Sequence, residues 1–171
     1  MITHVEREPG EERDCGRIWA LSDGRAGNAR QAEALAAALS VRSDALHLAP
    51  HAPWRWAAPR RLPFASHAFG SDFAAGLDAA PALAIGCGRQ AALATRLAGQ
   101  RGARTVQILD PRIDPRHWDL VVVPEHDALR GANVLVARGS LHPVDDAWLA
   151  AARDAHPDIG ALPGPRIAVL L

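Results

Sequence analysis

Short runs of apolar residues alternate with alanine-rich stretches along most of this chain. Several of the runs are continuously apolar, which is typical of strands in a parallel sheet that helices cover on both faces. The pattern predicts strands at residues 18–22, 44–48, 82–86, 104–109, 119–123, 133–137 and 166–171.

The stretches between the strands have the apolar spacing of amphipathic helices. Such spacing predicts helices at about 28–40, 89–100 and 145–156, with Asn28 and Asp145 as candidate N-caps. A repeated strand–helix–strand pattern predicts an α/β fold with a Rossmann-like open parallel sheet and helices on both faces.

Two segments interrupt this regular pattern. Residues 49–65 contain four prolines, and they cannot form one continuous helix because an interior proline costs about 3 kcal/mol. The sequence LPGP at 162–165 predicts a linker before the last strand. The expected organisation is a flexible N-terminal segment at 1–17, a domain at 18–161, and a linker with the first strand of a further domain at 162–171.

Composition and charge restrict the classes of function. The chain has 171 residues and 19 basic against 19 acidic side chains, whereas a nucleic-acid-binding protein normally has a basic surplus. Cys15 and Cys87 are far apart and belong to no CxxC motif, so neither a disulfide framework nor a zinc site is indicated. Residues 1–17 lack the apolar run of a secretory signal. We therefore expect a cytoplasmic protein without nucleic-acid partners, bound metal or resident cofactor.

Glycine and polar residues follow most of the predicted strands. Ligands of parallel α/β sheets bind outside the carboxyl ends of the strands, so these residues are candidates for a substrate site. In chain order the candidates are Ser22, Asp23, Gly24, Gly27, Asn28, Gly86, Gly88, Arg89, Gln107, Asp110, Arg112, Glu125, His126, Asp127, Arg138 and Gly139.

The first of these loops has two glycines before a predicted helix. Free backbone N–H groups and the positive end of the helix dipole favour a phosphate or a carboxylate at such a place. The alternative is a tight strand-to-helix turn in which Asp23 and Asn28 only cap the helix.

The second loop, GCGRQA at 86–91, matches the pattern G-x-G-x-x-A of dinucleotide-binding proteins, and Asp110 ends the next strand in the place of a ribose-binding acid. Glycines that let a helix pack closely on the sheet explain the same residues. The chain has no tyrosine, which excludes the Tyr–Lys pair of short-chain epimerases.

Glu125, His126 and Asp127 place an imidazole beside two carboxylates at a strand end. Such a group suits acid–base chemistry because histidine titrates near neutral pH. With one histidine and adjacent spacing it is a poor metal site. A solvated loop with local capping bonds is the alternative.

Five of the eight aromatic residues lie between Trp54 and Phe73, beside Arg55, Arg60 and Arg61. Trp54 and Trp56 in such surroundings suit peripheral contact with the inner face of a membrane, or a lipid-linked substrate. The alternative is an irregular segment whose rings pack on the core.

Four stretches together resemble a known family. They are WALSDGRAGNARQAEALAAAL at 19–39, LAIGCGRQAALATRLA at 83–98, RTVQILDPRIDPRHWDLVVVPEHD at 104–127 and NVLVARGSLH at 133–142. The family is named after a plant mitochondrial-fission factor, called "elongated mitochondria". The resemblance runs from about residue 18 to 171, and residues 107–127 are its most specific part.

Many bacterial members of that family are regarded as glycosyltransferases, which implies a two-domain architecture of the GT-B kind. This chain is similar to the first half, which in such enzymes usually receives the acceptor, while the second half binds most of the nucleotide-sugar donor. Related enzymes that act on lipid-linked acceptors often carry a histidine in the first glycine loop, where this chain has Asn28.

The leading hypothesis is therefore metal-independent sugar transfer from a nucleotide-sugar donor to an unknown acceptor. Asp23 or the Glu125–His126 pair would deprotonate the acceptor hydroxyl, because a hydroxyl is a weak nucleophile until a base takes its proton. Two alternatives stay open: an NAD(P)-binding nucleotide-sugar epimerase or dehydrogenase, and a non-enzymatic module that recruits a partner to a membrane.

Overall fold

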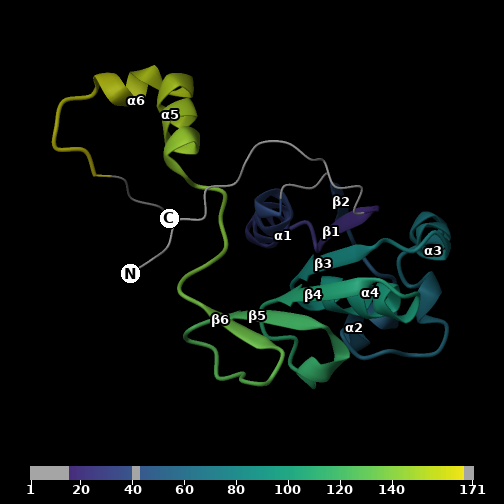
Figure 1. Cartoon of the computed structure of the whole chain (residues 1–171). Coiled ribbons are helices and arrows are strands. Elements are labelled where there is room, and N and C mark those ends of the chain that lie inside the picture. Colours follow the sequence, from purple (N-terminus) through teal and green to yellow (C-terminus); the bar gives the residue numbers. More distant parts are fainter. Residues whose placement is uncertain (1–15, 40–42, 168–171) are drawn as a thin grey trace.

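Six parallel strands form one open sheet in the computed structural model, which describes residues 16–39 and 43–167 (Figure 1). The strand order is β2-β1-β3-β4-β5-β6. This arrangement confirms the Rossmann-like α/β prediction, and each of the first six predicted strands agrees with the structure to within one residue. The strands are β1 (Ile18–Ser22), β2 (Ser43–His47), β3 (Leu83–Cys87), β4 (Arg104–Ile108), β5 (Leu120–Pro124) and β6 (Val134–Ala137).

Alternate residues of the central strands pack against helices on opposite faces of the sheet. Ile18 and Ala20 face α1 (Ala26–Ala38), where they pack with Ala32. Trp19 and Leu21 face α3 (Ser71–Asp78) and α4 (Arg89–Gln100) on the other side. Both faces of the central strands are therefore buried, which explains why their sequences are apolar throughout.

The start of α1 differs from the prediction. The helix begins at Ala26, and its N-cap residue Arg25 makes no capping bond with its side chain. Asn28 lies inside the first turn, where its side chain bonds to Asp23 instead of to the helix backbone. The prediction of Asn28 as N-cap was wrong because the loop that precedes the helix is shorter than the sequence suggested.

The proline-rich segment contains only short helices, as its prolines predict. They are α2 (Trp54–Ala57) and η1 (Ala65–His67). Sequence analysis did not predict α3, whose eight residues bury only Phe73 and Leu77. Two large apolar residues are too few for periodicity to reveal a helix.

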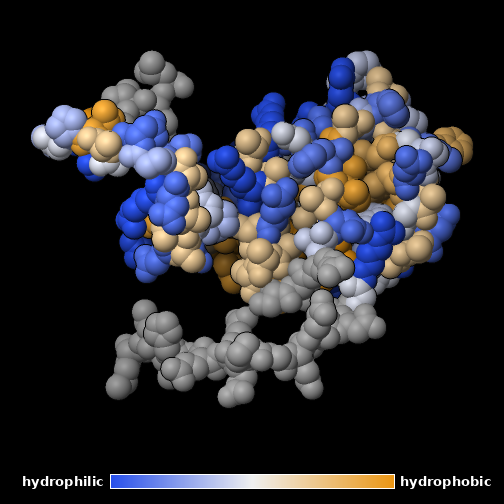
Figure 2. All heavy atoms as spheres, turned by 90° about the horizontal axis from the view of Figure 1, so that it is seen from above, coloured by the Kyte–Doolittle hydropathy of each residue, from blue (hydrophilic) through white to orange (hydrophobic). Residues whose placement is uncertain are grey.

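Beyond β6, the chain leaves the sheet (Figure 1). Helix α5 (Asp146–Ala155) forms where it was predicted, and the Asp145 carboxylate accepts a bond from Trp148 N at 2.7 Å. A second short helix, α6 (Pro157–Ala161), follows at once. No residue of either helix is buried, and the two project from the body of the molecule (Figure 2).

The last predicted strand falls mostly on residues 168–171, which lie outside the described residues. Residues 162–167 form neither helix nor strand, and Ile167 is exposed. The prediction that residues 1–17 form a separate segment falls almost wholly on 1–15, which are also outside the described residues. The expected division into domains stays a prediction.

Candidate functional site

The sheet has a topological switch point between β1 and β3. The connection that leaves β1 leads to β2 on one side of it, and the next strand in the chain, β3, lies on the other side. In open α/β sheets the ligand crevice forms at such a point, outside the carboxyl ends of the strands. The loop after β1 and the loop after β3 both begin there, because Ser22 and Cys87 are paired in the sheet.

Asp23, Asn28, Cys87 and Gly88 meet at this switch point. The Asn28 amide donates to the Asp23 carboxylate at 2.9 Å, and the Cys87 thiol lies 3.6 Å from the Asn28 carbonyl oxygen. Gly88 has a φ of 90°, and a Cβ built on it would lie 2.6 Å from Asn28 Nδ2. Only glycine accommodates both that backbone conformation and that approach. The two glycine loops that the sequence singled out separately therefore form one site.

Asp23 is a partly buried carboxylate at the switch point, and hydrogen bonds fix its orientation. Its side chain is 14% exposed, and Oδ1 accepts bonds from Arg25 N at 3.2 Å and from Asn28 Nδ2 at 2.9 Å. The Arg25 guanidinium lies 3.6 Å from Oδ2. These contacts fix the loop as a tight turn and leave Oδ2 with acceptor capacity for an incoming hydroxyl.

His47 is a site residue that sequence reasoning missed. It ends β2, next to β1 in the sheet, and its Nδ1 lies 2.9 Å from the hydroxyl of Ser22. Ser22 is buried and also accepts a bond from Gly24 N at 3.3 Å, whereas His47 is exposed. The strand prediction ran one residue past His47, so it was not considered among the residues that follow a strand.

Cys87 is not a nucleophile in this environment. Burial first, and then the charge of Asp23, raise the pKa of its thiol to about 12. The thiol is therefore protonated at neutral pH, and only a thiolate is reactive.

Gly86 and Gln107 both have close contacts within the protein, and their expected contacts with a ligand stay a prediction. Gln107 is fully buried, and its amide donates to the carbonyls of Ile108 at 2.8 Å and Gly88 at 3.3 Å. A Cβ on Gly86 would lie 2.6 Å from the Thr95 methyl group of α4. Gly86 thus lets α4 pack closely on β3, and Gln107 holds the Gly88 loop in place.

Arg89 also turns away from the switch point. Its guanidinium donates to the carbonyls of Trp56 at 3.3 Å and Ala58 at 3.1 Å. The side chain fastens the proline-rich segment to the start of α4. These bonds give Arg89 a positioning role, and its expected role in substrate binding stays a prediction.

In the loop after β4, the Asp110 carboxylate binds groups of the same loop. Asp110 Oδ1 accepts a bond from Arg112 N at 2.7 Å, and Oδ2 lies 3.5 Å from Arg112 Nε. Leu109 and Arg112 both have a positive φ, so the chain turns sharply here. Asp110 has the contacts of a turn residue, and the dinucleotide alternative that rests on it stays a prediction.

Glu125, His126 and Asp127 follow β5 on the same rim. Glu125 and His126 are exposed, and Arg130 holds this loop through the carbonyls of Glu125 and Asp127. Strands β3 and β4 lie between β1 and β5, which separates this loop from Asp23 by about 14 Å at the usual strand spacing. We therefore treat Asp23 and the Glu125–His126 pair as alternative bases.

The remaining candidates, two glycines near the switch point and two residues after β6, are all exposed. Gly24 and Gly27 are exposed beside the start of α1, with room around the Cβ position of each. Arg138 and Gly139 are exposed after the edge strand β6, farther from the switch point than His126.

Comparison with known proteins assigns the family. A scan against protein-family models matches residues 26–171 to "Mitochondrial fission ELM1". The chain belongs to the mitochondrial fission ELM1 family. Searches of curated proteins and of solved structures give no match. The resemblance stated from sequence motifs is thus confirmed at the level of the family.

The matched range of this ELM1-family chain includes the loops after β3, β4 and β5, while Ser22 and Asp23 immediately precede it. In residues 16–39 and 43–167, no three histidine, cysteine or acidic side chains are grouped so that they could hold a metal ion. No helix in the same ranges has the length and apolarity that a membrane crossing requires.

Proposed function

We propose that this chain forms the acceptor side of a glycosyltransferase of the GT-B kind. The observation that carries the proposal is the convergence of two glycine loops at the switch point, around a carboxylate whose orientation is fixed. Membership of a family whose bacterial members are regarded as glycosyltransferases supports it. The substrates are a nucleotide-sugar donor and an acceptor with a free hydroxyl group.

In the proposed reaction, the acceptor hydroxyl lies against Asp23 Oδ2. Its oxygen attacks the anomeric carbon of the sugar while the bond from that carbon to the nucleotide diphosphate breaks. The proton passes from the hydroxyl to Asp23, and the electron pair of the broken bond leaves with the diphosphate. Asn28 and Arg25 keep the carboxylate oriented throughout, which is the geometric requirement of general base catalysis.

Two histidines are alternative bases. His47 lies beside the same loop and is oriented by Ser22, while His126 lies farther along the rim. Replacing each in turn distinguishes them, because only the true base supplies the roughly 10²- to 10⁴-fold acceleration that general base catalysis provides.

The experiment is a transfer assay on the full-length protein that contains this chain. The protein is offered a panel of nucleotide sugars with a cell extract, and mass spectrometry records acceptors that gain a sugar. We expect at least one product that depends on both enzyme and donor. Absence of any transfer across the panel, with the protein folded, contradicts the proposal.

Peripheral membrane contact is a second proposal, favoured by two exposed aromatic side chains. Trp56 is 68% exposed and Phe64 is 79% exposed. Trp54 is different: it is half-buried, and its indole N–H donates to the carbonyl of Pro63 at 3.0 Å. The contact that the sequence assigned to both tryptophans is therefore proposed for Trp56 together with Phe64.

Liposome flotation tests this contact. The W56A/F64A double variant should float with anionic vesicles less than the wild type does, because interfacial binding scales with the apolar area that enters the membrane. A variant that exchanges the exposed Leu39, which follows α1, for alanine is the control, and it should behave as the wild type. Equal flotation of all three proteins, or none by any, contradicts the proposal.

A further inference from the structure

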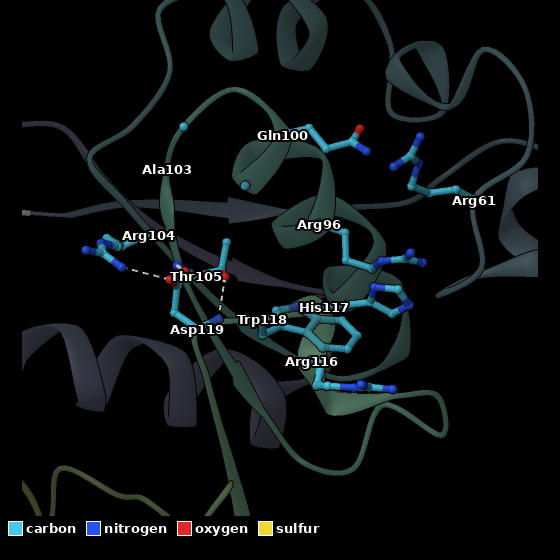
Figure 3. A pocket seen from close by; sticks show the side chains of 12 residues that line it. Arg61, Arg96, Gln100, Ala103, Arg104, Thr105, Arg116, His117, Trp118 and Asp119 are labelled. Atoms are coloured by element: carbon cyan, nitrogen blue, oxygen red, sulfur yellow. Dashed lines mark hydrogen bonds and ion pairs between the residues drawn. The ribbon is translucent and has the colours of Figure 1, made fainter. Parts of the chain in front are cut away.

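A groove of about 680 Å³ opens on the sheet edge opposite to the candidate site. It lies at the amino ends of β4 and β5, between the end of α4 and the short helix η2 (Pro115–His117), and Arg61 reaches it from the proline-rich segment (Figure 3). The carboxyl-end rule for parallel sheets does not apply to this edge, so the groove is separate from the switch point.

The groove concentrates positive charge in a chain whose net charge is zero. Its lining contains four arginines and His117, against Asp119 as the one carboxylate. Two of the arginines have acidic partners: Arg104 pairs with Asp119 at 2.9 Å, and Arg116 pairs with Asp114 at 2.7 Å. Across residues 16–39 and 43–167, no ion pair includes the other two, Arg61 and Arg96, or His117.

Arg96 is held in place for a ligand. One of its terminal nitrogens donates to the carbonyl of Pro59 at 2.6 Å, and its guanidinium carbon lies 6.0 Å from the centre of the Trp118 ring. Trp118 is buried, and its N–H donates to the Thr95 hydroxyl at 2.7 Å. Because both supports are fixed, Arg96 loses little conformational freedom on binding, and its second terminal nitrogen keeps its donors.

Arg61, Arg96 and His117 also disfavour one another's charged forms, although the Gln100 side-chain oxygen accepts hydrogen bonds from the Arg61 guanidinium. Burial and then the charge of Arg61 lower the pKa of Arg96. Burial and then Arg96 lower the pKa of His117, which Arg61 and Arg116 lower further and Asp114 raises. Figure 3 shows the Arg96 guanidinium beside the His117 ring, while the Arg61 guanidinium lies next to the Gln100 side chain. An anion placed among them would relieve this repulsion.

We propose that this groove is a binding site for a phosphate group, with Arg61, Arg96 and His117 as its ligands. A guanidinium offers paired donors that match phosphate oxygens, and imidazole adds a third donor. The volume exceeds that of one phosphate, so the natural ligand carries further groups. The site is additional to the proposed sugar transfer, and its test measures no transfer.

The phosphate can belong to a free metabolite or to a lipid headgroup, and the exposed ring of Phe64 lies three residues from Arg61. Calorimetry with pyrophosphate at low salt tests the first source. Sedimentation with vesicles of phosphatidic acid and phosphatidylcholine, against phosphatidylcholine alone, tests the second. Saturable binding in either experiment supports the site and identifies the source.

The variants R61Q and H117Q carry the test, because both side chains are exposed and neither supports the core. R61Q should weaken binding about tenfold, the usual loss for a charge-assisted hydrogen bond, and H117Q, which keeps a neutral donor, should weaken it less. The control is R60Q, which removes the same charge from an exposed arginine outside the groove and should leave binding within about twofold. A thermal melt confirms that each variant is folded.

Two results would overturn the proposal. One is the absence of saturable binding to both pyrophosphate and phosphatidic acid vesicles. The other is an equal loss of binding in R60Q and R61Q, because the groove geometry would then contribute nothing beyond net charge.

Discussion

Gly88 shows at the scale of single residues how the backbone brings the two loops together. Its φ of 90° is disfavoured for any side chain, and a Cβ would also come within 2.6 Å of the Asn28 amide. Gly70 offers a matched control, since it has the same φ and nothing within 4 Å of the Cβ position. Replacing each glycine by alanine therefore distinguishes the cost of backbone strain from the cost of a close contact.

The variant G70A should lose about 1–2 kcal/mol of unfolding free energy from backbone strain alone. G88A should lose about 1–3 kcal/mol more, because Asn28 must move away from Asp23. Urea unfolding of the two variants and the wild type measures both losses. Equal losses in G70A and G88A would contradict the close approach of the two loops.

Three residues show which contacts the sequence could not predict. The contact between Asn28 and Asp23 joins the first turn of α1 to the loop before it. The types of both residues suggested a role there, although the predicted capping bond was wrong. His47 was missed because its partner Ser22 is on a neighbouring strand, and pairing across a sheet cannot be seen in one sequence. Gln107 is a polar residue next to a candidate loop, so its type suggested a site residue. Only the structure shows that it is buried and supports the Gly88 loop.

At the scale of elements, η2 depends on a charged cap. The Asp114 carboxylate accepts bonds from Arg116 N at 2.9 Å and from the Arg116 guanidinium at 2.7 Å, and these bonds lower the pKa of Asp114 from 3.8 to about 2. Because that pKa is depressed in the folded state, the stabilisation is present above about pH 4 and is lost as the pH falls through 2. Both partners are exposed, so the effect is small.

The variant D114N tests this dependence. The difference in unfolding free energy between wild type and D114N should be constant above about pH 4 and should shrink toward pH 2. Urea unfolding of the wild type and D114N in parallel, at a series of pH values, measures it. A difference that grows toward pH 2 would show that the sign of the linkage is wrong.

Elements with strong periodicity were predicted well, and the reason is physical. Helix α4 buries seven of its twelve residues, and the central strands are covered on both sides, so their apolar patterns are complete. Helix α3 escaped notice because its short length carries only two buried side chains. Helix α5 formed as predicted, but periodicity indicates a helix and not the surface it packs on, and this helix buries no residue.

At the scale of the whole molecule, strand order decides where chemistry can occur. Six of the seven predicted strands form this sheet, but the sequence did not predict their order, which depends on how connections cross the sheet. The observed order places the loops after β1 and β3 together and the loop after β5 about 14 Å away. The strand order thus divides the candidate residues into a group at the switch point and a separate group in the loop after β5.

The order also separates two kinds of ligand chemistry. The carboxyl edge of the sheet presents an oriented carboxylate, which suits a hydroxyl substrate, whereas the amino edge presents unpaired arginines, which suit an anion. These charges lie at opposite ends of the strands in a chain with no net charge. Sequence analysis did not foresee the basic groove, because Arg61, Arg96 and His117 are far apart along the chain.

The most direct test of the account is the effect of D23N on sugar transfer by the full-length protein. The measurement is the rate of product formation by mass spectrometry, with the donor found active in the panel and with D72N as the matched control. The account predicts that D23N loses about 10²- to 10⁴-fold in rate, while D72N keeps the wild-type rate. A folded D23N protein that transfers sugar as fast as the wild type would contradict the switch-point site.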